Sequence, residues 1–183
     1  MLLHGSDGPG PRYRTAARVL ASTGHRVFVV HYLDRTGDKR AAFREISTKL
    51  PAWAAAARDG LAHVAAQPGV DARRVGVLGI SLGGGLGLLT AASEPRVRAF
   101  VNWFGFMPTG FSRPSRLPPT LVLHGAQDRV VPADNARALE RILTATGTPH
   151  EVVIYPGQGH GFTGDAQIDA ARRTAAFLGQ WMG

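Results

Sequence analysis

Gly79-Ile80-Ser81-Leu82-Gly83 follows the apolar run Val75-Gly76-Val77-Leu78 and precedes a small-residue segment, 84–92, that can form a helix. A serine between a strand and a helix, with glycines on both sides, is typical of a nucleophile elbow, because the strained turn tolerates only tiny neighbours. The pattern predicts that Ser81 stands at the carboxyl edge of a sheet and that the N–H of Leu82 points into the same space. The alternative is a glycine-rich turn with a capping serine.

A serine nucleophile needs a base and an orienting acid, and in this architecture they follow the serine in the order acid, then base. Asp128 comes shortly after the β-type run 120–124, and His160 lies on a glycine-rich loop after the run 151–155. Each comes just past a predicted strand, so we expect Ser81, Asp128 and His160 to meet as nucleophile, acid and base. The alternatives are a turn carboxylate that caps the next helix and a solvated loop histidine.

The other histidines are interpreted as structural or surface residues. His4 and His124 each close an apolar run as Leu-His-Gly, which predicts a role in shaping strand ends. His31 closes the run 26–30 and is the nearest competitor for a site role. Three more lie near predicted turns or helix ends: His25, His63 and His150.

A tetrahedral oxyanion at Ser81 needs a second N–H donor besides that of Leu82, usually from the loop after an early central strand. The chain opens with a strand end, 1–4, followed by the glycine-rich loop 5–10. We predict Ser6 as this donor. Asp7 is the alternative, and the sequence does not separate the two.

Together these blocks resemble the α/β-hydrolase fold and, within it, the dienelactone hydrolase family. The resembling segments extend over nearly the whole chain: LLHG at 2–5, HYLDRTG at 31–37, Trp53, 75–85, LPPTLVLHG at 117–125, Asp128 with Val131-Pro132, and 155–162. The resemblance implies Ser81 as nucleophile, Asp128 as acid and His160 as base. It also implies a small ester or lactone as substrate, with no metal and no organic cofactor.

Two features depart from that family. Dienelactone hydrolases use a cysteine nucleophile, and this chain contains no cysteine. They also hold the substrate carboxylate with arginines, one of them a few residues beyond the catalytic histidine, where this chain has GFTG at 161–164. The fold of the family is therefore better supported than activity on dienelactone itself.

Aromatic residues near the predicted strand ends are candidates for contact with the substrate. They are Tyr32, Phe104, Phe106 and Phe162. An apolar wall beside the serine would suit an apolar acyl or alcohol group. For the phenylalanines at 104 and 106 the alternative is ordinary packing under a loop.

Alternating strand and helix patterns predict an α/β fold with a doubly wound, mostly parallel sheet of about six strands and helices on both faces. The strands are expected near 1–4, 26–31, 75–80, 97–103, 120–124 and 151–155, and the helices near 11–23, 51–67, 82–93, 133–146 and 166–181. Residues 1–183 are interpreted as one domain. Only a short segment separates Trp103 from Thr120, which predicts an open site without a lid domain.

Composition excludes several classes of protein. The chain has 183 residues, 44% of them hydrophobic, and no cysteine, which removes disulfide scaffolds, cysteine zinc sites and thiol catalysis. No apolar run approaches the ~20 residues of a membrane span and no signal-peptide pattern opens the chain, so a cytoplasmic protein without membrane contact is expected.

The net charge of +8 raises the question of nucleic acid. The arginines are scattered and no binding motif accompanies them, so we expect no nucleic-acid partner. Some could steer anionic substrates towards the site: Arg12, Arg14, Arg35, Arg113 and Arg116.

Met1 falls within a strand expected to lie centrally in the sheet. The sequence therefore indicates either a minimal six-stranded version of the fold or a form lacking N-terminal strands. A strand edge left exposed would favour self-association, and a homodimer is the expected assembly.

The sequence thus predicts a serine hydrolase that cleaves small esters or lactones through an acyl-enzyme. A peptidase or an acyltransferase could use the same three residues. A binding module on a catalytically silent hydrolase scaffold is the alternative from another class.

Overall fold

The computed structural model describes residues 1–112 and 114–183 and is built around one sheet of six strands. The spatial order is β2-β1-β3-β4-β5-β6, and every neighbouring pair is parallel. The strands are β1 (Leu2–Leu3), β2 (Val29–Val30), β3 (Val75–Ile80), β4 (Val97–Trp103), β5 (Thr120–Gly125) and β6 (His150–Tyr155). The predicted α/β class and six-stranded parallel sheet are confirmed.

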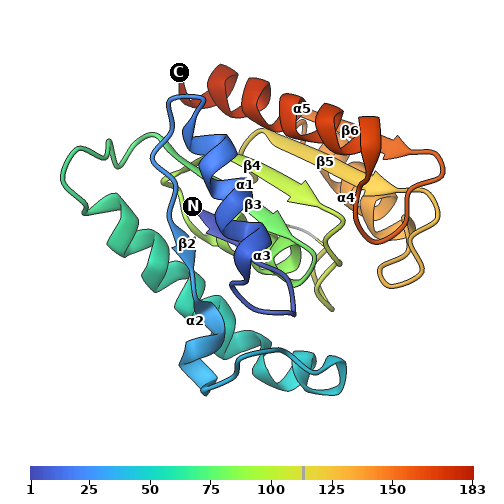
Figure 1. Cartoon of the computed structure of the whole chain (residues 1–183), viewed down its shortest axis with the longest axis horizontal. Coiled ribbons are helices and arrows are strands. Elements are labelled where there is room, and N and C mark those ends of the chain that lie inside the picture. The colour runs from blue at the N-terminus through green and yellow to red at the C-terminus, as the bar shows by residue number, and fades with distance from the viewer. Residues whose placement is uncertain (113) are drawn as a thin grey trace.

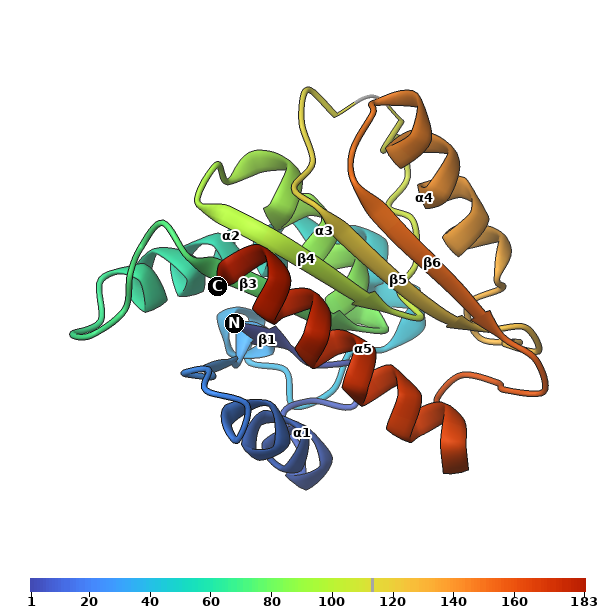
Figure 2. The ribbon, with the colours of Figure 1, turned by 90° about the horizontal axis from the view of Figure 1, so that it is seen from above.

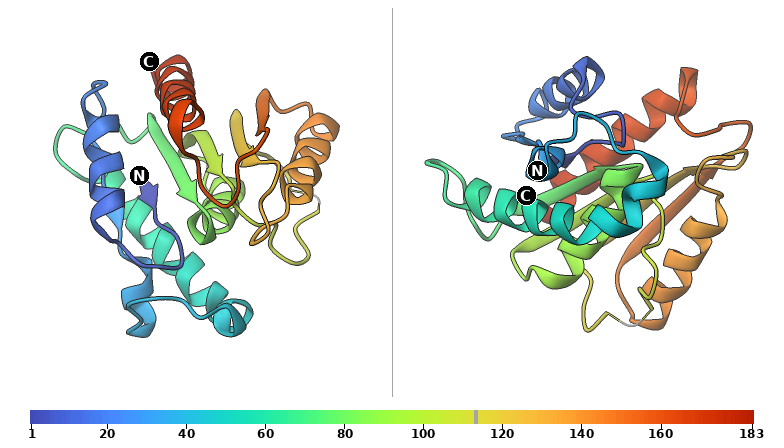
Figure 3. Two further views of the ribbon diagram at one scale, coloured as in Figure 1. Left: turned by 45° about the vertical axis from the view of Figure 1, so that its right-hand side comes forward. Right: turned by 90° about the horizontal axis from the view of Figure 1, so that it is seen from below.

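Helices cover both faces of the sheet, as Figures 1 and 2 show. On one face lie α1 (Pro11–Ala21) and α5 (Gly164–Met182), and on the other lie α2 (Ile46–Ala65), α3 (Leu82–Ser93) and α4 (Asp134–Ala145), most clearly separated in Figure 3. Each face has its own apolar core. Phe177 and Tyr13 pack in one core, and Trp53, Leu86 and Leu139 in the other.

Strands β3 and β5 are mostly apolar because both of their faces are covered. All residues of β3 and β5 are buried, which is typical of a parallel sheet between two helical layers. The short β1 pairs with β2 on one side and β3 on the other, and Leu2 and Leu3 are fully buried. Since the strands are parallel, the loops that follow β1, β3, β5 and β6 leave the sheet at one edge.

Helix α2 is the largest difference from the predicted boundaries. It begins at Ile46, whereas the sequence analysis placed this helix near 51–67. Here Pro51 lies within the helix, where it cannot donate an N–H bond to the preceding turn. Two 3₁₀ turns, Tyr32–Thr36 and Phe43–Glu45, were also not predicted.

No helix in the described part of the chain is both long and apolar enough to cross a membrane.

Candidate active site

Ser81 occupies the sharp turn between β3 and α3. Its φ of 56° and ψ of −116° are unusual for a residue with a side chain, and its N–H donates to the carbonyl of Trp103 at 2.9 Å. A Cβ on Gly79 would lie 2.2 Å from the carbonyl oxygen of Gly83, and a Cβ on Gly83 would lie 2.1 Å from that of Leu3. Both flanking glycines are therefore required by close backbone approach, and the strained turn exposes the Ser81 hydroxyl at the strand end.

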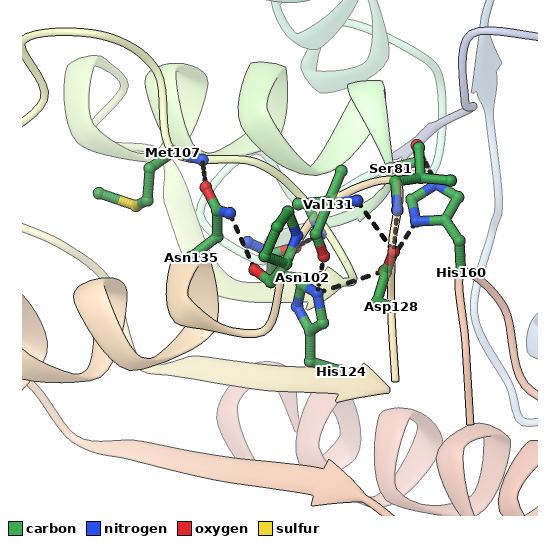
Figure 4. Close-up of polar contacts among 11 residues, drawn as sticks. Ser81, Asn102, Met107, His124, Asp128, Val131, Asn135 and His160 are labelled. Atoms are coloured by element: carbon green, nitrogen blue, oxygen red, sulfur yellow. Dashed lines mark hydrogen bonds and ion pairs between the residues drawn. The ribbon is translucent and has the colours of Figure 1, made fainter. Parts of the chain in front are cut away.

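Ser81, His160 and Asp128, which the sequence predicts to meet, form consecutive side-chain contacts, shown in Figure 4. Oγ of Ser81 lies 2.8 Å from Nε2 of His160, and Nδ1 of His160 lies 2.8 Å from Oδ2 of Asp128. A carboxylate can only accept, so the imidazole proton belongs on Nδ1, and Nε2 is left to accept the serine hydroxyl proton. This arrangement suits proton transfer from the serine to the histidine.

Both carboxylate oxygens of Asp128 have polar partners. Its Oδ1 accepts hydrogen bonds from the N–H groups of Val130 and Val131, both at 2.9 Å, and its side chain is fully buried. It does not cap the following helix, since α4 begins at Asp134 and its N-cap residue is Ala133. The carboxylate is thus fixed to face His160.

His124 is a neighbour of this carboxylate that the sequence interpretation assigned only to shaping a strand end. Its Nε2 lies 2.8 Å from the carbonyl of Val131 and 3.3 Å from Oδ2 of Asp128 (Figure 4). Burial lowers the pKa of His124, which favours the neutral ring. The Nε2 proton then faces the two oxygens. The sequence carries no signal for this contact, because a four-residue spacing brings side chains together in a helix and His124 lies at the end of a strand.

The loop after β1 lies directly against Ser81. A Cβ on Gly5 would be 3.5 Å from Cβ of Ser81, which leaves no room for another side chain between them. The next residue, Ser6, is the expected oxyanion donor. The N–H of Leu82 is in the first turn of α3, where a backbone N–H has no intrahelical acceptor. Both N–H groups therefore belong to segments that adjoin the serine.

Of the four aromatic residues expected to contact substrate, only Phe104 contacts His160, and both Phe104 and Phe162 are buried, at 7% and 8% exposed. The ring of Phe104 packs edge-on against the His160 ring at 4.9 Å between centroids, and Phe162 packs against Phe104 at 5.1 Å. Phe106 lies over α3, with its ring where a Cβ on Gly85 would fall.

Tyr32 requires a correction. It is only 1% exposed, and its hydroxyl donates to the carbonyl of His4 at 2.7 Å, so it has no free surface for a substrate. Its position in a 3₁₀ turn directs it beneath the loop that follows β1. The sequence located the residue near the site but not the direction of its side chain.

The four described arginines among those expected to steer anions do not gather in one place. Arg12 and Arg14 contact the loop that precedes α1, and Arg35 pairs with a carboxylate of α2. Arg116 contacts a backbone carbonyl between α3 and β4, at the edge opposite Ser81. Arg113 lies outside the described residues. No shared cationic patch at the serine follows from these positions.

His31 lies at the exposed end of β2, with a side chain 55% exposed and 3.9 Å from Asp34. It makes no contact with Ser81. Among the described residues, no group of three or more histidine, aspartate or glutamate side chains is arranged to hold a metal ion.

Comparison with known proteins gives a consistent result. Residues 10–181 match the dienelactone hydrolase family. A Salmonella typhimurium protein named "Putative carboxymethylenebutenolidase" is 31% identical over 170 residues, which cover 83% of this chain and 63% of that protein. The carboxymethylenebutenolidase of Rhodococcus opacus is 28% identical over 198 residues, covering 99% of this chain and 76% of that protein.

Solved structures agree on the fold. A Klebsiella pneumoniae protein titled "Putative Dienelactone Hydrolase" superimposes with a TM-score of 0.81 at 25% identity, covering 98% of this chain and 85% of its own. The chain spans 63% of the length of the Salmonella relative.

Proposed function

The chain belongs to the dienelactone hydrolase family, and from this premise we propose that it is a serine hydrolase that cleaves carboxylic ester or lactone bonds of small substrates. The observation that carries the proposal is the line of contacts from Ser81 through His160 to Asp128. A carboxymethylenebutenolidase is a lactone hydrolase, which makes lactones a natural substrate class to test.

Ser81 attacks the substrate carbonyl while Nε2 of His160 takes the hydroxyl proton. Asp128 holds the imidazole in the required tautomer and stabilises the imidazolium that forms. The tetrahedral oxyanion accepts hydrogen bonds from the N–H groups of Leu82 and Ser6. The proton on Nε2 then passes to the leaving alkoxide, and the acyl group remains on Ser81 as an ester.

Deacylation repeats these roles with water in place of the serine. His160 takes a proton from a water molecule that attacks the acyl-enzyme, and the second tetrahedral intermediate collapses to the free acid as His160 returns that proton to Oγ of Ser81. With a lactone, the alcohol and the acid produced are parts of the same molecule. The ring of Phe104 packs against the ring of His160 and gives this base an apolar neighbour.

A fluorophosphonate probe and a substrate panel test this proposal. The probe should label Ser81 stoichiometrically, and Ser81→Ala should abolish both labelling and ester hydrolysis, with kcat lowered about 10³-fold or more. Ser93→Ala is the matched control, because the Ser93 hydroxyl only bonds carbonyls at the end of α3. A panel of p-nitrophenyl esters and lactones identifies the preferred class.

The same experiment separates the alternatives. A labelled protein that cleaves amides or transfers acyl groups faster than it hydrolyses esters is a peptidase or an acyltransferase. A folded protein that is not labelled is a binding module. An adduct on Ser6, Ser93 or Ser112 would contradict the assignment of the nucleophile.

A further inference from the structure

Two buried tyrosine hydroxyls form hydrogen bonds with the His4–Gly5 peptide, one at its carbonyl and one at its N–H. Its carbonyl oxygen accepts a hydrogen bond from the Tyr32 hydroxyl at 2.7 Å, and its N–H donates to the Tyr13 hydroxyl at 2.9 Å. Tyr13 comes from α1 and Tyr32 from the 3₁₀ turn after β2, so two separate elements hold one peptide unit. Each tyrosine is only 1% exposed. This peptide therefore cannot rotate without breaking a buried hydrogen bond at either end.

The next peptide, Gly5–Ser6, is held as well. Its carbonyl oxygen lies 2.8 Å from Nδ1 of His4 and 3.4 Å from the Tyr32 hydroxyl, and it accepts from the N–H of Gly8 at 3.2 Å. The peptide is trans, so the N–H of Ser6 points away from this cluster of donors.

The protonation states support these contacts. Burial lowers the pKa of His4, so its ring is neutral, and the ring stacks on Tyr32 at 4.3 Å between centroids. Burial and the bond to Asp7 raise the pKa of Tyr13 to about 12, and burial raises that of Tyr32. Both phenols thus remain protonated at neutral pH.

The Tyr13 hydroxyl has its full set of partners. It accepts from Gly5 N–H and from Arg12 at 2.5 Å, and it donates to Oδ1 of Asp7 at 2.5 Å. A Cβ on Gly5 would lie 2.6 Å from this hydroxyl and 3.5 Å from Cβ of Ser81. Gly5 thus lies between the Tyr13 hydroxyl and Ser81, so this hydrogen-bond network adjoins the reacting centre.

We propose that Tyr13 and Tyr32 are positioning residues that hold the loop after β1 so that the N–H of Ser6 is already aimed at the oxyanion formed on Ser81. The inference rests on the proposed function. An oxyanion donor is effective only when it needs no reorganisation during the reaction, and two fixed peptides in succession supply that rigidity. Neither tyrosine touches the substrate.

The test compares Tyr13→Phe and Tyr32→Phe with Tyr155→Phe. Tyr155 is the third tyrosine of the chain, and its hydroxyl bonds Asp169 on α5, away from this loop. Complete loss of one oxyanion donor lowers kcat about 10²–10³-fold, so a misaimed donor should lower it about 10-fold or more. KM should stay nearly unchanged, and Tyr155→Phe should keep the wild-type kcat.

Two further measurements separate positioning from general stabilisation. The first is the ratio of kcat/KM for an ester to that for its thionoester, whose sulfur is a weak hydrogen-bond acceptor and gains little from the donors. This ratio should fall in both loop variants. The second is amide hydrogen exchange of residues 2–12, which should quicken in these variants and not in Tyr155→Phe.

The outcomes are distinct. Suppose that the wild type is active and that the two variants, Tyr13→Phe and Tyr32→Phe, fold. If both then keep the wild-type ester-to-thionoester ratio and the wild-type rate of amide exchange in residues 2–12, the inference is wrong and the proposed function stands. If the wild type neither hydrolyses esters nor reacts with the fluorophosphonate, both are wrong. Should Tyr13→Phe fail to fold, Tyr32→Phe carries the same prediction, because its hydroxyl holds the carbonyl of the same peptide.

Discussion

Nε2 of His124 lies 3.3 Å from Oδ2 of Asp128, the carboxylate oxygen that also lies 2.8 Å from Nδ1 of His160. Both histidines therefore present an N–H to one oxygen, but only His160 reaches Ser81. Because burial lowers the pKa of His124, its contribution is a neutral N–H rather than a second positive charge. The Asp128 carboxylate therefore has no second positive ring beside it when the imidazolium forms on His160.

Replacing His124 with phenylalanine should weaken both stability and catalysis. The change keeps a planar ring but leaves the partly buried carbonyl of Val131 without its 2.8 Å donor. An unsatisfied buried acceptor costs about 1–3 kcal/mol of unfolding free energy. We expect a partial loss of kcat as Asp128 becomes less well oriented. Urea denaturation and ester kinetics measure the two effects.

His124→Gln is the matched control, since its amide NH₂ can donate in place of Nε2. It should keep most of the activity and most of the stability. If His124→Gln were as damaging as His124→Phe, the donated hydrogen bond would not be what the histidine supplies.

His160→Gln should cost about as much activity as Ser81→Ala, roughly 10³-fold or more in kcat, because members of such a triad act as a unit. Asp128→Asn should also be severe, since an amide no longer fixes the Nδ1–H tautomer of the imidazole. His31→Gln is the control, because that side chain is exposed at the end of β2. Equal losses in folded His31→Gln and His160→Gln variants would show that the base is misassigned.

The sequence was sufficient for the sheet and for the meeting of Ser81, Asp128 and His160. Each of these residues follows an apolar run, and the runs form parallel strands whose carboxyl ends share one edge. Local pattern and topology together therefore bring distant residues close, without any knowledge of side-chain packing.

Side-chain direction was beyond the sequence. Tyr32 was expected to face substrate, but the 3₁₀ turn that contains it points its hydroxyl at the carbonyl of His4. His124 was expected to shape a strand end, and its contact with Asp128 depends on how the loop 125–131 folds back. Both outcomes are decided by tertiary packing, on which periodicity and residue type carry no information.

Gly83→Ala should destabilise the fold and abolish activity. The new Cβ would lie 2.1 Å from the carbonyl oxygen of Leu3, so α3 must move away from β1 or the loop after β1 must shift. Overpacking of this kind costs about 1–3 kcal/mol, and a contact with backbone leaves little room for relief. Denaturant midpoint and fluorophosphonate labelling rate report the two losses.

Gly179→Ala provides the comparison. Gly179 lies in α5, and a Cβ there would meet no atom within 4 Å. Alanine in a helix interior is favoured over glycine by about 0.5–1 kcal/mol, so this variant should be slightly more stable than the wild type and equally active. A stable, active Gly83→Ala protein would contradict the close approach of α3 to β1.

Acid should destabilise the protein from about pH 6.5 downward through its two buried histidines, His4 and His124. Burial lowers the pKa of both below the ordinary value of 6.5, so the unfolded chain binds protons in this range that the folded chain does not. The free energy of unfolding therefore falls as the pH falls, by at most about 1.4 kcal/mol per pH unit for each group. Urea midpoints measured between pH 7.5 and 5 should show this slope. His124→Gln should flatten it and His63→Gln, on the exposed side of α2, should not; an unchanged slope in His124→Gln would contradict the lowered pKa.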